Sequence, residues 1–364
     1  MRSSAGAQVV EEVGLLAPSP WRRILARRGA VVSLCILGTL WGGGLLAPVL
    51  EAVLGVQHDV VMLPQRYGEP SFPHLLGTDE LGRDVLARLL YGGRISLLVA
   101  VLAALSSGAI GLCVGVVAGY FGGWVDSALM RITDAMLSVP LLPLVLLIAA
   151  LAPGSPEGEP SWVRHVVASM AISSGAGLAW WHRRRAGLAS ASTGLYLLCF
   201  VLVLGGSAVV LLSTTDHSFR AVLHMLGLIV VFGWMTVARL ARGAAMQVRN
   251  QDFVLAARAL GAGHTWILRR HILPNVFGPV LVAVTLDVGS NILLEAALSF
   301  LGLGVQPPVP SWGNMLGVSL DALKKAPWLV FWPGAFIFLT VASMNVLGDH
   351  LRQVLDPAAM NPRR

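Results

Sequence analysis

Hydrophobic residues of this 364-residue chain gather in long runs, and polar residues collect in the intervals between them. A helix needs about 20 consecutive apolar residues to cross a membrane. Runs near that length predict eight membrane-spanning helices. They lie near residues 30–50, 96–119, 135–152, 163–181, 193–213, 221–238, 276–300 and 328–347. The pattern therefore predicts an all-α, polytopic membrane protein.

Composition supports this fold class and excludes others. Hydrophobic residues make up 55% of the chain and charged residues 12%, whereas soluble proteins have about 25% charged residues. The net charge of +7 does not indicate nucleic-acid binding, because the arginines stand at the ends of apolar runs and not along one face. Cys35, Cys113 and Cys199 each lie inside an apolar run, which predicts buried, reduced thiols and no disulfide.

The distribution of basic residues predicts the orientation. Four arginines within residues 22–28 precede the first apolar run, which is longer than a signal-peptide core and has no small-x-small cleavage site after it. We therefore expect an uncleaved first helix and a cytoplasmic tail at 1–29. Most of the 26 Lys and Arg residues then fall on the cytoplasmic side, and eight crossings return the tail at 349–364 to the cytoplasm.

Residues 252–275, DFVLAARALGAGHTWILRRHILPN, form a polar segment between two membrane-length runs. The spacing predicts a helix-turn-helix in which Ala257 and Gly261 lie one turn apart on one face. Such a small-residue face can approach another protein closely. Pro274 can occupy the first turn of the next helix but cannot continue the preceding one. The segment is suited to transmit force between a soluble partner and the bilayer.

A second motif, HLLGTDELGRDVLARLLYGGRISL, occupies residues 74–97. Thr78 or Asp79 can cap a helix that carries Asp79 and Glu80 in its first turn, where carboxylates suit the helix dipole. An apolar stripe follows at i, i+4 and i+8: Leu81, Val85 and Leu89. We expect an amphipathic helix on the outer surface. A catalytic acidic cluster is the alternative, but no partner base or metal ligand is nearby.

Glycine recurs every four residues in the second span, at Gly111, Gly115 and Gly119. This stripe favours close packing with another helix, although a helix that merely tolerates glycine would show it too. The segment GYFGGWVD, residues 119–126, predicts a tight cytoplasmic turn with Trp124 at the membrane interface.

Asp287, Asn291 and Glu295 recur every four residues in the seventh span and so share a face. Ionisable groups at membrane depth cost about 2.5–3.5 kcal/mol each on insertion scales, and they normally face a bundle interior or a wet path. Two interpretations stay open: a polar wall of a translocation path, and a hydrogen-bond cluster between helices. Glu295 is also near enough to the outer end to be solvated.

The next segment, LSFLGLGVQPPVPSWGNML at 298–316, contains three prolines within four positions, which rule out a continuing helix. We expect a stiff, extended outer segment with Trp312 at the interface. A rigid connector is the simpler interpretation.

Four motifs, LGTDELGRD, GYFGGWVD, residues 252–275 and residues 298–316, resemble those of dipeptide/oligopeptide (DppC/OppC-type) permease subunits of ABC importers. The resemblance covers about residues 20–152 and 221–350. Residues 252–275 resemble the EAA loop, the helix that docks on the ATPase subunit in that family, although Leu255 stands where the motif has Glu. The resemblance assigns ATPase coupling to Asp252, Ala256, Ala257, Gly261, Ile272, Leu273 and Pro274.

The resemblance implies a six-helix type I ABC importer transmembrane domain at 92–348, preceded by a first helix and an extracytoplasmic loop at 30–91. Residues 153–220 replace a short outer link of that core. One crossing by this insert would place the EAA-like loop outside, whereas two crossings keep it in the cytoplasm and place the arginines at 183–185 inside. We therefore predict an inserted transmembrane hairpin, interpreted as a peripheral, lipid-facing addition; the alternative is a regulatory or partner-docking role.

The implied function is ATP-driven import of di-/oligopeptides across the cytoplasmic (inner) membrane by alternating access. The implied partners are a homologous second permease, two cytoplasmic ATP-binding subunits and an extracytoplasmic peptide-binding protein. The chain itself should be non-catalytic and need no cofactor or metal, because no lysine follows glycine as a P-loop requires, and no HExxH or CxxC occurs. The alternatives are import of nickel or another small solute, an ion-coupled carrier that uses Asp287 and Glu295, and a structural scaffold.

Overall fold

The computed structural model describes residues 25–140, 143 and 217–355, and these are helical with connecting loops. The helices are α3 (Arg28–Leu54), α4 (Val85–Phe121), α5 (Gly123–Leu137), α9 (His217–Arg249), α10 (Asp252–Ala259), α11 (His264–Ile267), α12 (Leu273–Phe300), α13 (Trp312–Ser319) and α14 (Trp328–Leu355). Short 3₁₀ turns lie at Leu63–Gln65 (η1) and Leu320–Ala322 (η3), and a π-helical turn, η2, lies at Leu268–Ile272.

Five helical stretches in the described part of the chain are long and apolar enough to cross a membrane. They are Arg28–Leu54, Val85–Phe121, Met225–Arg249, His264–Phe300 and Trp328–Leu355. They confirm the all-α membrane fold and match five of the predicted spans. The predicted spans at 163–181 and 193–213 and most of 135–152 lie outside the described residues. The count of eight and the hairpin at 153–220 therefore stay predictions.

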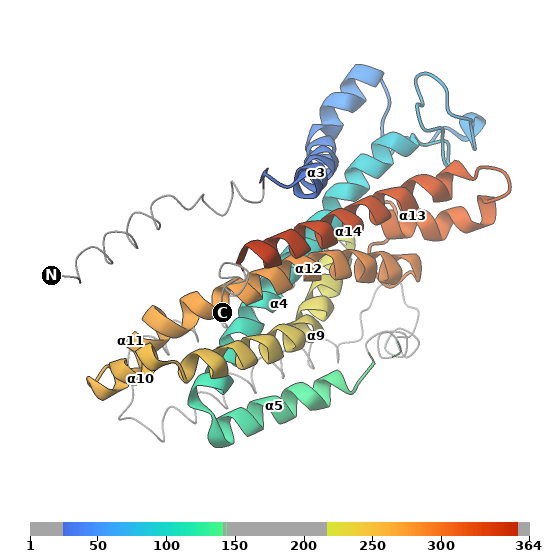
Figure 1. The fold of residues 1–364 in the computed structure, drawn as a ribbon. Coiled ribbons are helices and arrows are strands. Elements are labelled where there is room, and N and C mark those ends of the chain that lie inside the picture. Colours follow the sequence, from blue (N-terminus) through green and yellow to red (C-terminus); the bar gives the residue numbers. More distant parts are fainter. Residues whose placement is uncertain (1–24, 141–142, 144–216, 356–364) are drawn as a thin grey trace.

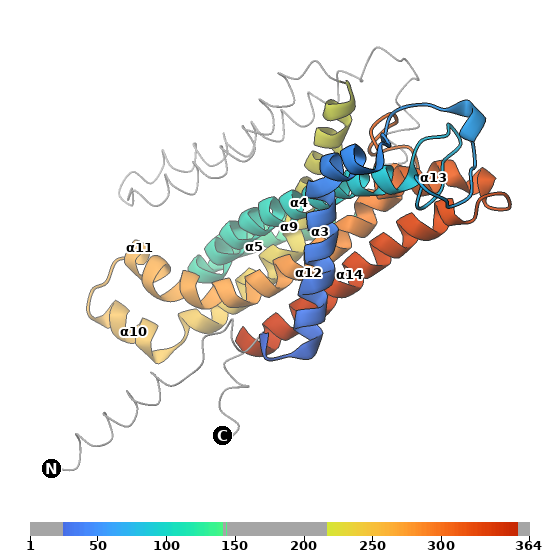
Figure 2. The same ribbon diagram turned by 90° about the horizontal axis from the view of Figure 1, so that it is seen from above.

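Helices α4, α9, α12 and α14 run side by side along the length of the bundle, and α3 crosses them obliquely (Figures 1 and 2). Helices α10 and α11 form one end, while α13 and the loop before α4 lie toward the other. Helix α4 has 37 residues, well beyond the ~20 that a bilayer requires. It therefore links the two ends of the molecule.

The most extensive contact between helices joins α4 to α9, and the glycine stripe makes it possible. A Cβ atom on Gly111, Gly115 or Gly119 would lie closer than 3 Å to backbone atoms of α9. The facing carbonyls belong to Trp234, Ala238 and Arg242, one for each glycine in turn. The packing interpretation of the stripe is therefore confirmed.

The start of α4 differs from the prediction. The helix begins at Val85, and its cap is Asp84, whose carboxylate accepts a hydrogen bond from the Ala87 N–H at 2.7 Å. Asp79 instead accepts from the N–H groups of Leu81 and Arg83, both at 2.9 Å, within its own turn. The prediction of a helix cap at Thr78 or Asp79 was therefore wrong, because the Asp79 carboxylate stabilises a turn of the chain and not the start of a helix. Gly82 completes that turn with φ of 75°.

Arg83 and Arg88, before and at the start of α4, are held in ion pairs. Arg83 pairs with Asp79 at 2.7 Å and with Glu80 at 2.9 Å, and Arg88 lies 3.4 Å from Asp79. Both arginine side chains and that of Asp79 are less than a tenth exposed. The acidic cluster thus belongs to a largely buried ion-pair network that holds the loop before α4 on that helix.

The predicted turn after α4 is present. Helix α4 ends at Phe121, and α5 begins two residues later after Gly122, which has φ of 67°. Trp124 is 59% exposed, as an interfacial position requires. Two ion pairs then hold α5 against α9: Asp126 with Arg242, and Asp134 with Arg239.

Trp312 does not lie at the membrane interface. The segment with the prolines is non-helical, as expected, but α13 then folds back into the bundle. Trp312 is 1% exposed, and its indole N–H donates to the Leu89 carbonyl at 2.9 Å. Gly93 of α4 leaves room for its ring. The interfacial prediction was wrong because α4 supplies both a slot and a hydrogen-bond acceptor for the indole.

The start of α3 and the end of α14 lie together. Arg27 donates to the side chain of Gln353, and its Nη1 lies 3.5 Å from Nδ1 of His350. Ala30 and Val354 pack in a small apolar cluster beside these contacts. The described ends of the chain are therefore on the same side of the bundle.

Candidate functional site

Residues 251–272, here named the α10–α11 segment, project from one end of the bundle (Figure 1). Helix α9 ends at Arg249, and a turn at 250–251 leads directly into α10. After residues 260–263, helix α11 continues through η2 into α12. The segment is thus attached by short or continuous backbone to two membrane-spanning helices.

One face of α10 is buried against the bundle. Val254 is 0% exposed and Ala257 is 9% exposed. Both belong to an apolar cluster that also contains Ile267 and Ile272 of the segment and Val116 of α4. Ala257 was predicted to face a partner, and this placement was wrong: its small side chain lets α10 approach its own bundle.

Large apolar side chains of the α10–α11 segment are exposed, among charged residues that include Arg258 and Arg269. Leu260 is 88% exposed, Trp266 52%, Leu255 49% and Phe253 45%. Ala256 lies on the exposed side as well, and Asp252 is exposed at the start of α10. Large apolar side chains gathered on one projecting segment are typical of a protein–protein contact surface.

Gly261 serves the turn that ends α10. Its φ is +83°, a left-handed conformation that glycine adopts without strain, and a Cβ there would meet nothing within 4 Å. The N–H of Ala262 bonds the Ala257 carbonyl and the N–H of Gly261 bonds that of Arg258, both at 3.0 Å, in the usual glycine-terminated pattern. Gly261 therefore ends α10 and is itself exposed, so its place in a docking face stays a prediction.

The second half of the segment passes into the membrane without a break. Pro274 lies in the first turn of α12, as the sequence allowed, but helical structure precedes it through η2. There the N–H of Leu273 reaches the Leu268 carbonyl, five residues back, in a π-helical turn. Ile272 is buried, Leu273 is half-buried and Pro274 is exposed. Pro274 does not end a helix, because helical structure continues from α11 through η2 into α12.

Asn291 and Glu295, on the polar face of α12, lie inside the bundle. The Asn291 side chain donates to the Ala100 carbonyl of α4 at 3.5 Å. Glu295 is 0% exposed and accepts from the Ser299 hydroxyl at 2.7 Å. The hydroxyls of Ser96 and Ser311 also lie near its carboxyl group. Glu295 is therefore not solvated at the interface, and the contacts of Asn291 and Glu295 favour a hydrogen-bond cluster between helices. Asp287 is half-buried.

Sequence reasoning missed the residues that complete this cluster. Ser311 accepts from the Asn314 N–H while the Asn314 side chain accepts from the Ser311 N–H, a reciprocal cap on α13. Asn314 also donates to the carbonyls of Val305 and Val309 and so fastens the proline-containing loop. The signal was present as Ser-x-x-Asn, a variant of the capping-box spacing.

Comparison with known proteins agrees with this geometry. A family described as binding-protein-dependent transport system inner membrane component matches residues 111–361, which is more than half of the chain. The chain belongs to this family of transport permeases. The match includes the glycine stripe, the α10–α11 segment and the polar face of α12.

Several relatives of this permease are named as peptide permeases, and the similarity to them extends over most of each chain. The dipeptide transport system permease protein DppC of Bacillus subtilis (strain 168) is 35% identical over 341 residues, 93% of this chain and 84% of DppC. The oligopeptide permease protein OppC of the same organism is 31% identical over 359 residues, 98% of this chain and 95% of OppC. OppC of Mycobacterium bovis is 30% identical over 343 residues. The resemblance to dipeptide and oligopeptide permeases is confirmed.

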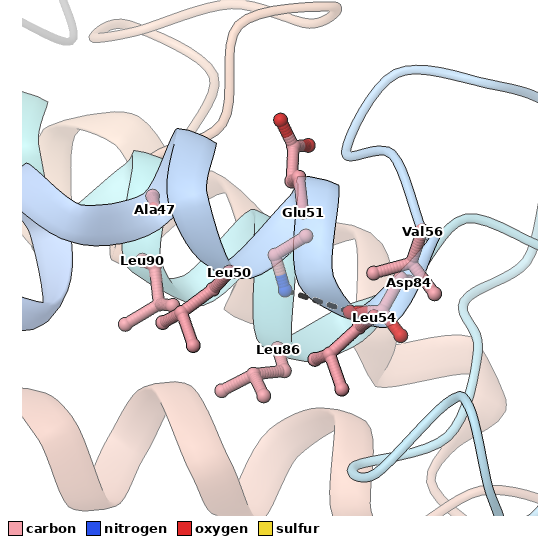
Figure 3. Close-up of a pocket in the computed structure, with 9 residues that line it drawn as sticks. Ala47, Leu50, Glu51, Leu54, Val56, Asp84, Leu86 and Leu90 are labelled. Atoms are coloured by element: carbon pink, nitrogen blue, oxygen red, sulfur yellow. Dashed lines mark hydrogen bonds between the residues drawn. The ribbon is translucent and has the colours of Figure 1, made fainter.

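A small hollow between α3 and the start of α4 of the permease is too small for a peptide (Figure 3). Its free volume is about 10 Å³, enough for about one water molecule. Glu51 points away from its centre and instead binds the backbone N–H of His58 at 2.7 Å and the Tyr91 hydroxyl at 2.9 Å. This hollow is a gap in packing between two helices.

Substitutions at Glu295 separate the two interpretations of the polar face. We expect Glu295→Ala to lower the free energy of unfolding by about 2–4 kcal/mol, because it leaves a cavity and removes the acceptor of Ser299. Glu295→Gln should cost less, because its amide oxygen can accept the same bond. Thermal unfolding in detergent measures both. A Glu295→Gln permease that assembles normally but loses all uptake would contradict the structural interpretation.

Proposed function

We propose that this chain is the permease subunit of an ATP-driven importer of di-/oligopeptides, and that ATPase subunits dock on the α10–α11 segment. The observation that carries the proposal is the exposed apolar face of Phe253, Leu255, Leu260 and Trp266 at one end of a peptide-permease-like bundle. Leu255, where the related motif has Glu, enlarges this face. These apolar side chains therefore contribute to the docking contact, beside the exposed Arg258, Arg269 and Arg270.

The attachment of the segment supports a mechanical role. Helix α10 is buried on one side by Val254 and Ala257, so a force on its exposed side presses on the bundle. The backbone continues from the segment into α9 at one end and, through η2, into α12 at the other. When the ATPase subunits close, α9 and α12 tilt with the docking surface. This tilt changes access between the two sides of the membrane.

The partners follow from the same machinery. A homologous second permease completes the translocation path, two ATP-binding subunits supply the energy, and an extracytoplasmic peptide-binding protein delivers the substrate. Both termini and the α10–α11 segment lie in the cytoplasm. The contacts of Arg27 with His350 and Gln353 support the common side of the termini. The chain itself catalyses no reaction.

Reconstitution tests this function. We expect proteoliposomes with this permease, its partner permease and the ATPases to accumulate a labelled di- or oligopeptide when the binding protein and ATP are supplied. ADP in place of ATP is the control. Uptake that follows a proton or sodium gradient without ATP would contradict the proposal. Uptake of nickel but of no peptide would contradict the substrate class while leaving the machinery intact.

Cysteine labelling in intact cells tests the orientation. We expect Gly263→Cys, in the exposed loop between α10 and α11, to react with a membrane-impermeant maleimide only after the cells are opened. Phe72→Cys is the matched position in the loop before α4, where Phe72 is 81% exposed, and it should react from outside. Both variants need a background in which Cys35, Cys113 and Cys199 are replaced by alanine. Labelling of residue 263 in intact cells would exclude ATPase docking there.

A further inference from the structure

Tyr120, near the end of α4, contacts both arms of the α10–α11 segment. It is 3% exposed and lies in the apolar cluster that contains Val254 and Ile267. Its hydroxyl lies 2.8 Å from Nδ1 of His264, the first residue of α11. The Arg258 guanidinium of α10 stands over its ring, 5.2 Å from the ring centre. One buried side chain therefore touches the segment on each side of its turn.

The backbone of Tyr120 is held as well. Arg249, the last residue of α9, donates from Nη1 to the Tyr120 carbonyl at 3.2 Å. The ring of Phe121 packs edge-on against the Tyr120 ring, with centres 5.1 Å apart. The end of α4, the end of α9 and both short helices thus meet at this tyrosine.

Helix α4 needs such a link because it has no backbone connection to the segment. The segment continues into α9 and α12, whereas α4 turns away into α5. Yet α4 packs on α9, α12 and α3 and carries the slot for Trp312 at the outer end. Apolar packing of Val116 with Val254 and Ile267 also joins α4 to the segment. Tyr120 adds a directional contact to each arm, through His264 and Arg258, and so ties the movement of both arms to α4.

We infer that Tyr120 is a positioning residue that fastens both arms of the docking segment to α4, so that ATPase movement reaches the outer end of the bundle. The inference rests on the proposed function. Without these contacts of Tyr120, the segment still binds the ATPases, but less of its movement reaches α4. The loss then appears as ATP hydrolysed without peptide transport.

Tyr120→Phe tests the inference most directly, because it removes only the hydroxyl that meets His264. The readout is peptide transported per ATP hydrolysed in the reconstituted complex. We expect this ratio to fall about fivefold, the factor equivalent to about 1 kcal/mol and to one net hydrogen bond. Co-purification of the ATPases and the thermal unfolding midpoint should stay near wild type. Tyr120→Ala should lower the ratio further, because it also removes the ring beneath Arg258.

Two further variants sharpen the test. His264→Phe should reproduce the Tyr120→Phe ratio, and combining them should give little further loss, because both remove the same bond. Tyr91→Phe is the matched control, since it removes a hydroxyl bonded to Glu51 at 2.9 Å near the opposite end of the same helix. Its ratio should be unchanged.

The outcomes are distinct from those of the proposed function. A wild-type complex without ATP-driven uptake would overturn the proposed function itself. A normal ratio in both Tyr120→Phe and Tyr120→Ala, with a functional wild type, would overturn only the role of Tyr120. Loss of ATPase co-purification in Tyr120→Phe would also overturn it, because the tyrosine would then serve docking and not the link to α4.

Discussion

Replacing both Leu255 and Leu260 with aspartate is expected to abolish co-purification of the ATPase subunits and, with it, peptide uptake. The two side chains are 49% and 88% exposed on the projecting face of the α10–α11 segment. Their substitution should not disturb the bundle, because neither belongs to its buried clusters. A partner surface that accepts leucine would have to bury two unpaired carboxylates. Burial of even one costs about 2 kcal/mol or more, which lowers association at least about 30-fold.

Affinity purification through a tag on this permease measures the effect, with insertion checked by the yield of folded chain in the membrane. Leu75→Asp is the matched control, because Leu75 is 47% exposed in the loop before α4, away from the α10–α11 segment. That variant should retain the ATPases. Full retention of the ATPases by the Leu255/Leu260 double variant would refute docking on this face.

Gly115→Val is expected to have the largest effect on stability. Gly115 lies where α4 and α9 approach most closely, and even a Cβ would lie within 3 Å of the Ala238 carbonyl and the Ala241 methyl. The backbone of α9 cannot move aside as a flexible side chain can, so a valine at position 115 must push α4 and α9 apart. Overpacking of this kind costs about 1–3 kcal/mol or more. It acts at the largest interface between helices in the described bundle. We expect a large drop in the unfolding midpoint in detergent and little monodisperse protein.

Gly243→Val on α9 provides the comparison. A Cβ at Gly243 meets nothing within 4 Å, and glycine and valine differ by only a few tenths of a kcal/mol in helix propensity. The isolated chain should therefore unfold near the wild-type midpoint. Equal midpoints for the Gly115 and Gly243 variants would show that α4 and α9 do not need close approach.

Sequence patterns predicted the features that depend on local composition and spacing. The apolar runs located the five described spans. The spacing of Gly111, Gly115 and Gly119 predicted a close contact between helices, which the structure confirms. Motif spacing placed the α10–α11 segment and indicated the peptide-permease family that the comparisons confirm. These features can be predicted from sequence because each depends only on residues within a short stretch of the chain.

Orientation of single side chains was less predictable. Ala257 and Trp312 were both assigned outward positions, and both face the bundle. Helical spacing states which residues share a face but not which neighbour covers that face. Ala257 lies in an apolar cluster with residues of α4, α11 and η2, and the Trp312 indole bonds Leu89 of α4.

The chain by itself determined that it is a helical membrane protein with a polar, projecting segment between two spans, because membrane solvation and helix geometry act on consecutive residues. Only the tertiary structure decided which face of that segment is free, that Glu295 is enclosed by serine hydroxyls, and that Tyr120 joins α4 to both arms of the segment. The link made by Tyr120 depends on a contact with His264, 144 positions away in the sequence. No local pattern specifies such pairs, since each forms only when long helices have packed in one register.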